Sequence, residues 1–463
     1  MNDPTPLSKP KNKLAIAFER ARDAHLAGRL DEAIGHYRDV LRLAPEHGGA
    51  LNNLGVALKT QNRFAPAIAC YRRALATKPD DVGLLTNLGN ALRGLGRFDE
   101  ARTVLKRAMV LNPRSVDALN NLSLTYKGER QFKEAIDGLT EVVRLRPYDA
   151  EAHLDLALSL LQSGEYRRGF AEYEWRWRTK ELPPRKFDQP AWDGKPLDGK
   201  TILLHAEQGY GDAIQFARYV PMVVAQGGKV VLECLNGLER LMQSLGSVDH
   251  IVTKGAVPPP FDVQAPLLSL PHLFGTSLET IPAPPRYLSA ETEQIAHFGA
   301  RLAAPSGVLK VGIVWAGKPS HKNDYNRSAG FSQFIDLLGI GGVRWYGLQV
   351  GPRAADIVAH DCQGLLEDLA PELNDFATSA AAIENLDLVI SVDTSVAHLT
   401  GALGKPIWLA LAFGGEWRYP EGREDSPWYP SMRLFQQTRF GDWDGVFRRI
   451  AESLQAREGL AQA

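Results

Sequence analysis

Three short segments of the sequence combine glycine, hydroxyl, acidic and basic residues in patterns typical of a site for a charged ligand. The first, His205-Ala-Glu-Gln-Gly-Tyr-Gly-Asp212, follows an expected strand and opens a helix. Glycine lets backbone N–H groups approach a ligand closely, so Gly211 is a candidate ligand contact. Asp212 would lie in the first turn of the helix, at the carboxyl end of the sheet, where α/β proteins bind ligands. The alternative is that Asp212 only caps its own helix and interacts with the helix dipole.

The second segment, Leu388–Pro406, contains Ser-Val-Asp-Thr-Ser-Val-Ala-His-Leu-Thr. A buried strand ends before Asp393, and a helix begins near Ser395. Unpaired N–H groups and hydroxyls at a helix start suit a diphosphate, which makes Asp393, Thr394 and Ser395 candidate ligand-binding residues. His398, one turn into the helix, would face the same site and is ionisable near neutral pH. The alternative is a capping Asp or Thr and a core histidine.

The third segment, Gly312–Ser328, is a strand followed by a polar loop. The loop carries four cationic or ionisable side chains: Lys318, His321, Lys322 and Arg327. Several cations on a loop above a helix start form an anion site, and Ser328 can cap the next helix. The alternative is an ordinary solvated loop.

The elements before these segments follow a strict repeat. Four prolines recur every 34 residues, at Pro45, Pro79, Pro113 and Pro147. Alanines keep the same step at Ala33, Ala67, Ala101 and Ala135, and so do a leucine column and an aromatic column. A period of 34 with this pattern resembles the tetratricopeptide repeat (TPR), a helix–turn–helix unit whose copies stack into a solenoid. About five units are expected over residues 14–180.

A column of polar residues recurs within the repeats, at Asn53, Asn87, Asn121 and Asp155. An amide both donates and accepts, so a row of them on the inner helices would bind the backbone of an extended peptide. This column resembles the asparagine ladder in the TPR region of protein O-GlcNAc transferases. The alternative is that these amides bond the adjacent repeat or simply follow the TPR consensus.

Residues 181–200 are rich in Pro, Gly and Asp and are expected to be a linker. After them the 34-residue repeat is no longer present, and the pattern of apolar residues changes. Strand-like runs then alternate with helical ones, which predicts parallel sheets built from βαβ units. The expected organisation is a disordered segment 1–13, the TPR array, the linker, and two Rossmann-like lobes at 201–300 and 305–463. The fold class is thus an α-solenoid followed by a two-lobed α/β module.

The second half resembles the heptosyltransferase-like glycosyltransferases, which have the two-lobed B-type fold, over roughly residues 187–455. The strings that carry the resemblance are GYGDAIQFARYVP, GIVWAGKPSHKNDYNRS, SVDTSVAHLTGALGKP and DSPWYPSMRLF. The resemblance implies that Asp393, Thr394, Ser395 and His398 bind a nucleotide-sugar donor. It implies that Arg327, with Lys318 or Lys322, neutralises the leaving phosphates and that Asp212 is the base. It also implies no metal and no cofactor besides the donor. This chain has Asp-Thr-Ser where the family shows Asp-Thr-Gly; Glu207, Glu416 and Asp425 are further carboxylates.

Composition limits the other possibilities. The net charge is -1 and gives no bulk attraction to nucleic acid. The 3 cysteines are far apart, which argues against disulfides or a structural zinc site. No apolar run reaches the length of a membrane span and no secretory signal is visible, so the expected location is the cytoplasm.

These observations favour an inverting, metal-independent glycosyltransferase whose TPR array recruits a protein acceptor on its concave face. The alternative is a TPR scaffold with a degenerate nucleotide-sugar-binding module. A third reading is transfer to a lipid or glycan, with the repeats serving only in assembly.

Overall fold

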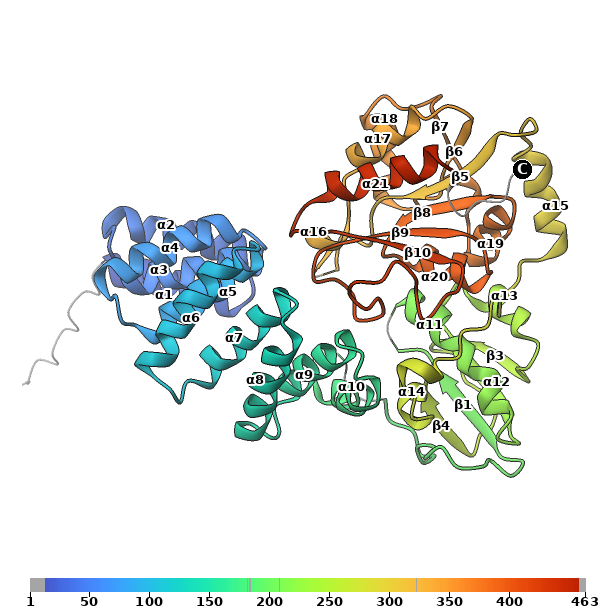
Figure 1. The fold of residues 1–463 in the computed structure, drawn as a ribbon. Helices are drawn as coiled ribbons and strands as arrows, with labels where there is room; N and C mark the ends of the chain where they lie inside the picture. The colour runs from blue at the N-terminus through green and yellow to red at the C-terminus, as the bar shows by residue number, and fades with distance from the viewer. Residues whose placement is uncertain (1–12, 181, 183–184, 208, 322, 458–463) are drawn as a thin grey trace, which may run out of the picture. The chain divides into compact units, whose positions relative to one another are not determined.

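The computed structural model describes residues 13–180, 182, 185–207, 209–321 and 323–457 (Figure 1). The chain divides into two compact units, residues 1–156 and 157–463, each of which is described by itself. Of the segment 1–13 that was expected to be disordered, residues 1–12 lie outside the described residues, whereas Lys13 begins the first helix. A phosphate contact by Lys322 also lies outside the described residues.

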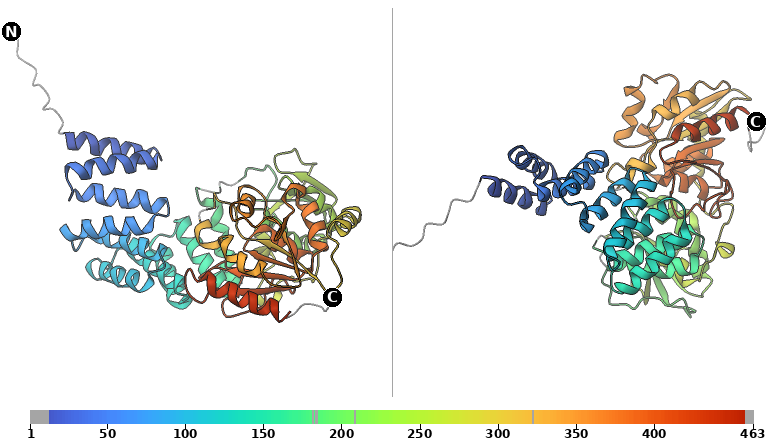
Figure 2. Two further views of the ribbon diagram at one scale, coloured as in Figure 1. Left: turned by 90° about the horizontal axis from the view of Figure 1, so that it is seen from above. Right: turned by 60° about the vertical axis from the view of Figure 1, so that its left-hand side comes forward.

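The first unit is a stack of antiparallel helix pairs. Its helices are α1 (Lys13–Leu26), α2 (Leu30–Leu43), α3 (Gly48–Thr60), α4 (Phe64–Thr77), α5 (Val82–Gly94), α6 (Phe98–Leu111), α7 (Val116–Gly128), α8 (Phe132–Leu145) and the first half of α9 (Ala150–Gln162). Figure 2 shows the successive helices of this unit stacked side by side. The solenoid predicted from the period of 34 is confirmed.

Local sequence sets the ends of these helices. The prolines follow the second helix of each pair, where a residue without an N–H cannot continue it. His47, Asp81 and Ser115 then cap the next helix, each accepting a hydrogen bond from the N–H three residues later. The turn within each pair needs a positive φ, which Gly28 and Gly96 adopt at 74° and 73°.

Small and aliphatic residues make the core of the array. The alanines of the 34-residue column are fully buried at the helix crossings, and Leu54 and Leu88 fill the space between pairs. Besides the contacts within each pair, α1 contacts α3, α3 contacts α5 and α5 contacts α7. The odd-numbered helices therefore line the inner side of the stack, as in other TPR solenoids.

The second unit begins with the end of α9, then α10 (Tyr166–Tyr173) and a 3-10 helix over Glu174–Arg178. Tyr166 and Phe170 of α10 pack on Trp417 and Trp428. Trp177, which follows α10, contacts His205, with ring centroids 6.3 Å apart.

The first sheet is parallel, in the order β3-β2-β1-β4. Its strands are β1 (Thr201–His205), β2 (Lys229–Cys234), β3 (His250–Thr253) and β4 (Val263–Pro266). Its helices are α11 (Tyr210–Phe216), α12 (Val220–Val224), α13 (Glu239–Met242) and α14 (Leu270–Leu273). The helical stretch after β1 is broken after Phe216 because Pro221 cannot donate a backbone hydrogen bond.

The second sheet is also parallel, in the order β10-β9-β8-β5-β6-β7. Its strands are β5 (Leu309–Val314), β6 (Val343–Gly347), β7 (Leu366–Asp368), β8 (Leu388–Val392), β9 (Ile407–Leu411) and β10 (Met432–Gln436). Its helices are α15 (Thr292–Arg301), α16 (Asp324–Arg327), α17 (Ser332–Leu338), α18 (Asp356–Ala359), α19 (Phe376–Glu384), α20 (Ser395–Ala402) and α21 (Trp443–Gln455). Parallel sheets flanked by helices are thus confirmed.

The two sheets approach each other through their helices. One face of the second sheet is covered by α17 and α21, whose Phe334 and Phe447 join the strand residues in one buried core. On the other side, α20 packs against α11 of the first sheet (Figure 1). The first segment, His205–Asp212, leads into α11, and the second, Leu388–Pro406, contains α20. The packing of α11 on α20 therefore brings the two segments together.

Candidate functional site

Two of the three segments begin at the centre of the second sheet. Strands β5 and β8 are hydrogen-bonded neighbours, and each leads at its carboxyl end into one of the candidate loops. The strands that follow β5 in the sequence, β6 and β7, lie on one side of this pair, and the strands that follow β8, β9 and β10, lie on the other. The strand order therefore reverses between β5 and β8. In open α/β sheets, ligands bind outside the carboxyl ends of the strands at the place where the strand order reverses.

Arg327 joins the two loops. It ends α16, its guanidinium donates to the backbone oxygen of Asp393, and its Nη2 lies 3.4 Å from Asp393 Oδ2. The arginine side chain is about one-quarter exposed, at 23%. Arg327 and Asp393 are therefore brought together as predicted, whereas Lys318 is exposed on the loop.

Ser328 has a different role from the predicted helix cap. It follows α16, and its hydroxyl accepts from the Gly317 N–H at 3.0 Å and donates to Asp324 Oδ1 at 2.6 Å. The next helix, α17, begins only at Ser332. The cap expected at Ser328 is wrong because this side chain is used to close its own loop.

The start of α20 is built by the Asp393 turn. Thr394 is the N-cap residue, but no side chain caps the helix. The Thr394 hydroxyl lies 3.0 Å from Ser391 Oγ, while Ser395 is half-buried. The predicted helix start is confirmed, and the interpretation of Asp393 or Thr394 as its side-chain cap is wrong.

His398 is buried at the lobe boundary, with an exposed fraction of 5%. Its Nδ1 lies 2.9 Å from the Tyr429 hydroxyl. Burial, together with the charges of Arg418, Arg218 and Arg327, holds the pKa of His398 well below its usual value. At neutral pH the imidazole is therefore expected to be uncharged, in contrast to the expectation that it titrates there.

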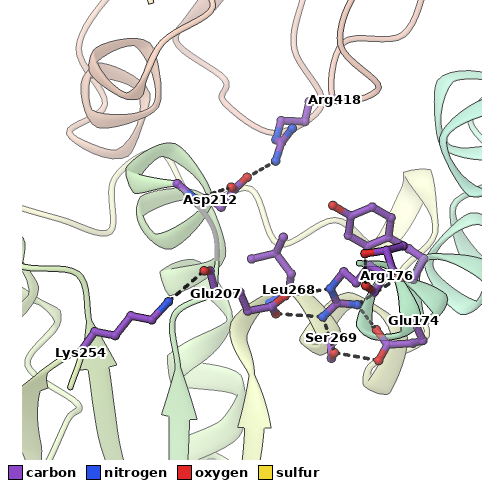
Figure 3. Close-up of polar contacts among 11 residues, drawn as sticks. Glu174, Arg176, Glu207, Asp212, Lys254, Leu268, Ser269 and Arg418 are labelled. Atoms are coloured by element: carbon purple, nitrogen blue, oxygen red, sulfur yellow. Dashed lines mark hydrogen bonds and ion pairs between the residues drawn. The ribbon is translucent and has the colours of Figure 1, made fainter. Parts of the chain in front are cut away.

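The first segment meets the second at Gly211. A Cβ at this position would lie 2.7 Å from His398 Cδ2, so only glycine fits. Asp212 lies in the first turn of α11, where its Oδ2 accepts from the Gly209 N–H at 3.0 Å. Its other oxygen pairs with Arg418, which belongs to the loop after β9 (Figure 3). Asp212 therefore caps its helix and also bridges the two sheet regions.

Arg418 is the site residue that sequence reasoning missed, and Glu416 was named only as a further carboxylate. Arg418 also donates to Glu416 and to Gln215 Oε1, so one guanidinium holds two carboxylates. Burial raises the pKa of Glu416, as do the charges of Asp393 and Asp212, against the opposing effect of Arg418. The available signal was position, since both residues follow the carboxyl end of β9.

Glu207 belongs to a buried ion pair. Its side chain is fully buried, accepts two hydrogen bonds of 2.8 Å from Arg176, and also accepts from the Leu268 N–H (Figure 3). Arg176 further donates to Glu174 and Ser269. Asp425 is exposed and pairs with Arg423. Of the three further carboxylates, only Glu416 lies among the site residues.

The polar column of the array lies on the odd-numbered helices. Its asparagines and Asp155 are all half-buried. Asn87 donates to Asn52 of the preceding inner helix at 3.0 Å, and Asn121 donates to the backbone oxygen of Asp117 at 2.9 Å. These bonds fit the alternative in which the amides stabilise the array, and their predicted contact with a peptide stays a prediction.

No three His, Cys, Asp or Glu side chains in the described part of the chain are grouped so that they could hold a metal ion. Within the same part, no helix is long and apolar enough to cross a membrane.

Comparison with known proteins identifies the repeats. Residues 13–80 and 60–122 match two tetratricopeptide-repeat family models. Protein FlbA of Caulobacter vibrioides is 30% identical over 330 residues, which cover 65% of this chain and 54% of FlbA. The chain thus spans about half the length of this relative. Because the first unit holds only 156 of the 463 residues, the match must extend into the sheet region.

Solved structures resemble the array at low scores. A thermophilic TPR protein of Thermus thermophilus is 21% identical, with 36% of this chain and 92% of that chain covered and a TM-score of 0.34. PilW, described as a widely conserved type IV pilus biogenesis factor, is 22% identical, with 36% of this chain and 80% of that chain covered and a TM-score of 0.34. These scores carry no argument by themselves. The family models and the helix pairs together establish that the N-terminal part of the chain consists of TPR repeats, which point to protein–protein interaction.

Proposed function

We propose that the chain is an inverting glycosyltransferase that transfers a sugar from a nucleotide-sugar donor to a protein recruited by its TPR array. The observation that carries the proposal is the meeting of three segments. The loops after β5 and β8 are joined by Arg327 and Asp393, and α11 enters the same place with Gly211 against His398. Cations and a helix start that no side chain caps are what a diphosphate requires.

The strand order supports the two-lobed, nucleotide-binding fold that this proposal requires. Read from β7, the second sheet has the order 3-2-1-4-5-6 of the doubly wound nucleotide-binding fold. A smaller parallel sheet with the order 3-2-1-4 precedes it. Two such lobes with their helices in contact fit the B-type glycosyltransferase architecture, in which donor and acceptor meet between the lobes.

The proposed chemistry is a single displacement. The acceptor hydroxyl oxygen attacks the anomeric carbon, and the bond from that carbon to the diphosphate breaks. The nucleoside diphosphate leaves with its electron pair, and Arg327 with the start of α20 offsets the charge that develops on it. A carboxylate takes the acceptor proton. Asp212 is the proposed base, and Glu416 is the alternative because its raised pKa favours proton uptake.

Donor binding is the first test. All nine tryptophans lie beyond residue 156, so tryptophan fluorescence follows the melting of the second unit alone. We expect UDP-, GDP-, ADP- or CMP-sugars of one nucleotide class to raise the melting temperature, since a ligand that binds only the folded state stabilises it. Arg327→Gln should abolish the shift. Arg423→Gln, which alters an exposed pair in the same unit, should retain it.

Transfer is tested separately by the release of nucleoside diphosphate, with water as a slow acceptor. Asp212→Asn should keep the donor-induced shift and lose at least about a hundredfold in release, the typical contribution of general base catalysis. If Glu416→Gln has this effect and Asp212→Asn does not, the base is Glu416. If no donor class shifts the melting temperature, the chain is better described as a TPR scaffold with a degenerate nucleotide-sugar-binding module.

A further inference from the structure

Tyr419 carries a buried hydroxyl that has no hydrogen-bond partner in the described part of the chain. The residue lies in the loop after β9, in the turn that also holds Glu416 and Arg418, and its N–H donates to the Glu416 carbonyl oxygen at 3.1 Å. Its exposed fraction is 6%. A buried hydroxyl without a partner destabilises the folded protein, so its presence points to a role that the free protein does not display.

An unpaired buried hydroxyl does not by itself mark a binding site. Tyr71 of α4 in the array also has one, within the part of the chain that the structure describes. Its ring packs closely against Gly55 of α3, and it is fully buried in the apolar core of the helix pairs. There the aromatic ring alone accounts for the residue.

The surroundings of Tyr419 are different because they are charged. Burial and the charges of Asp393 and Glu416 raise the pKa of Tyr419 well above its usual value, against the opposing effect of Arg418 and Arg327. These four residues belong to the candidate site. The hydroxyl is therefore a protonated hydrogen-bond donor that lies among the charged side chains of the site.

Two more donors of the same ion-pair network are buried without an acceptor among the described residues. Gln215 accepts from Arg418 through Oε1, but its Nε2 is unpaired. Arg327 pairs with Asp393 through Nη2, but its Nε is unpaired. Unpaired donors at one network fit a ligand that brings several acceptor oxygens.

The nearby carboxylates decide which kind of oxygen suits Tyr419. A phosphate oxygen accepts a hydrogen bond but carries negative charge, and Asp393 and Glu416 would repel it. A sugar hydroxyl accepts from the phenol and donates its own proton to a carboxylate. In the proposed reaction the diphosphate is bound by Arg327 and the start of α20. A hydroxyl of the sugar is thus the group that fits beside Tyr419.

We propose that Tyr419 binds a hydroxyl group of the transferred sugar, with Glu416 of the same turn as the acceptor of that hydroxyl's proton. Tyr419 would thereby make the site select the sugar nucleotide over the free nucleotide. The inference rests on the proposed glycosyltransferase function and names a residue that determines its donor specificity.

Binding of matched ligands to the full chain tests the proposal. Free UDP, GDP, ADP and CMP are each compared with sugar nucleotides of the same class, such as UDP-glucose, UDP-galactose, GDP-mannose and ADP-glucose. Dissociation constants come from the rise of the tryptophan-monitored melting temperature with ligand concentration. In the class that binds, Tyr419→Phe should weaken the sugar nucleotide about tenfold through the loss of one hydrogen bond and leave the free nucleotide unchanged.

Tyr346→Phe is the matched control in the same unit. It removes the buried hydroxyl of Tyr346 on β6, which donates to the Leu302 carbonyl oxygen at 3.4 Å, and should leave both affinities unchanged. Without ligand, Tyr419→Phe should melt at a higher temperature than the wild type, because it removes an unpaired buried hydroxyl. Tyr346→Phe should show no such gain.

Monodeoxy forms of the sugar nucleotide identify the hydroxyl that is bound. One of them should bind the wild type about tenfold more weakly than the parent donor. That form alone should bind Tyr419→Phe as tightly as it binds the wild type, since the two partners of one hydrogen bond are then both absent.

The contrary outcomes are specific. Equal weakening of the free nucleotide and the sugar nucleotide by Tyr419→Phe would overturn the inference, because the phenol would then serve the nucleotide part. Unchanged affinity for both ligands would overturn it as well. Either result leaves the proposed function intact as long as the wild type binds a donor and Arg327→Gln does not. If the wild type binds none of these ligands, the proposed function fails and this inference fails with it.

Discussion

The two units differ in whether they bury charged side chains. In the array, over residues 13–156, no Asp, Glu, Lys or Arg is buried; the buried polar residues there are Thr86, Ser123, Thr125 and His153. The sheet-containing unit buries charged side chains, among them Arg176, Glu207, Arg218, Glu233 and Arg418. The array is stabilised by repeated apolar contacts between neighbours in sequence. The second unit depends on ion pairs between distant segments, which are costly to break.

The largest effect is expected from breaking one such pair. Arg176→Met leaves Glu207 fully buried without its guanidinium, which should lower the free energy of unfolding of the second unit by about 3–5 kcal/mol. Urea unfolding followed by tryptophan fluorescence measures this change. Arg107→Met, which removes an exposed pair in the array, should cost less than about 1 kcal/mol by circular dichroism.

The double variant Arg176→Met/Glu207→Leu sharpens this test. Removing both charges should restore much of the lost stability, because apolar residues of similar size can replace a buried pair. Comparable small losses in Arg176→Met and Arg107→Met would show that the two units do not differ in this respect.

The next effect is a loss of stability in acid that is specific to the second unit. Burial lowers the pKa of His205 from 6.5 to about 4, so the unfolded chain takes up a proton at a pH where the native state does not. The contribution of neutral His205 is fully present above pH 6.5 and is lost as the pH falls towards 4. The loss amounts to roughly 3 kcal/mol, from about 1.4 kcal/mol for each unit of pKa.

The difference between wild type and His205→Gln isolates this contribution. Glutamine can still contact Gln264, the partner of His205 Nε2, but it does not titrate. The variant should therefore lose less stability between pH 7 and 4 in tryptophan-monitored urea unfolding. Parallel pH profiles for the two proteins would exclude His205 as the cause.

The smallest effects distinguish two glycines within helices of the array. A Cβ at Gly89 would lie 2.4 Å from Leu105 Cγ, whereas none of the surrounding atoms comes within 4 Å of a Cβ at Gly35. Gly89→Ala should therefore destabilise the array by about 1–3 kcal/mol through overpacking. Gly35→Ala should stabilise it by about 0.5–1 kcal/mol through helix propensity.

Circular dichroism melting measures both changes, and tryptophan fluorescence serves as the control. The midpoint of the fluorescence transition should stay constant in both variants if the units unfold independently. A gain of stability in Gly89→Ala would mean that Leu105 can yield and that the close helix crossing is not required.

Much of the fold could be predicted because the determining signals are local. The proline and alanine columns report on helix ends and helix crossings within each repeat. Strands β1, β2, β5, β6, β8 and β9 coincide with the strand-like runs of the second half. Strands β3, β4, β7 and β10 were missed. Three or four residues carry too weak a pattern in β3, β4 and β7, and β4 lies within a proline-rich stretch.

The candidate site was predictable in part for the same reason. Asp393 and Asp212 follow strands, and the carboxyl ends of parallel strands form one edge of a sheet. The partners of these residues were not predictable. Arg418 is 206 positions from Asp212, and Glu207 was taken for a spare carboxylate although Arg176 holds it. Neither the burial of a charged side chain nor the identity of its distant partner can be predicted from the residues that surround it in the sequence.

The sequence by itself thus determined the repeat period, the helix pairs, the change to parallel sheets and the three polar segments, because each follows from patterns within about one repeat or one strand. Tertiary structure alone decided which charges are buried, which arginine holds Asp212, and that His398 stays neutral against Gly211. These outcomes depend on the exclusion of water between segments that are far apart in the chain, and water exclusion exists only once the chain has folded.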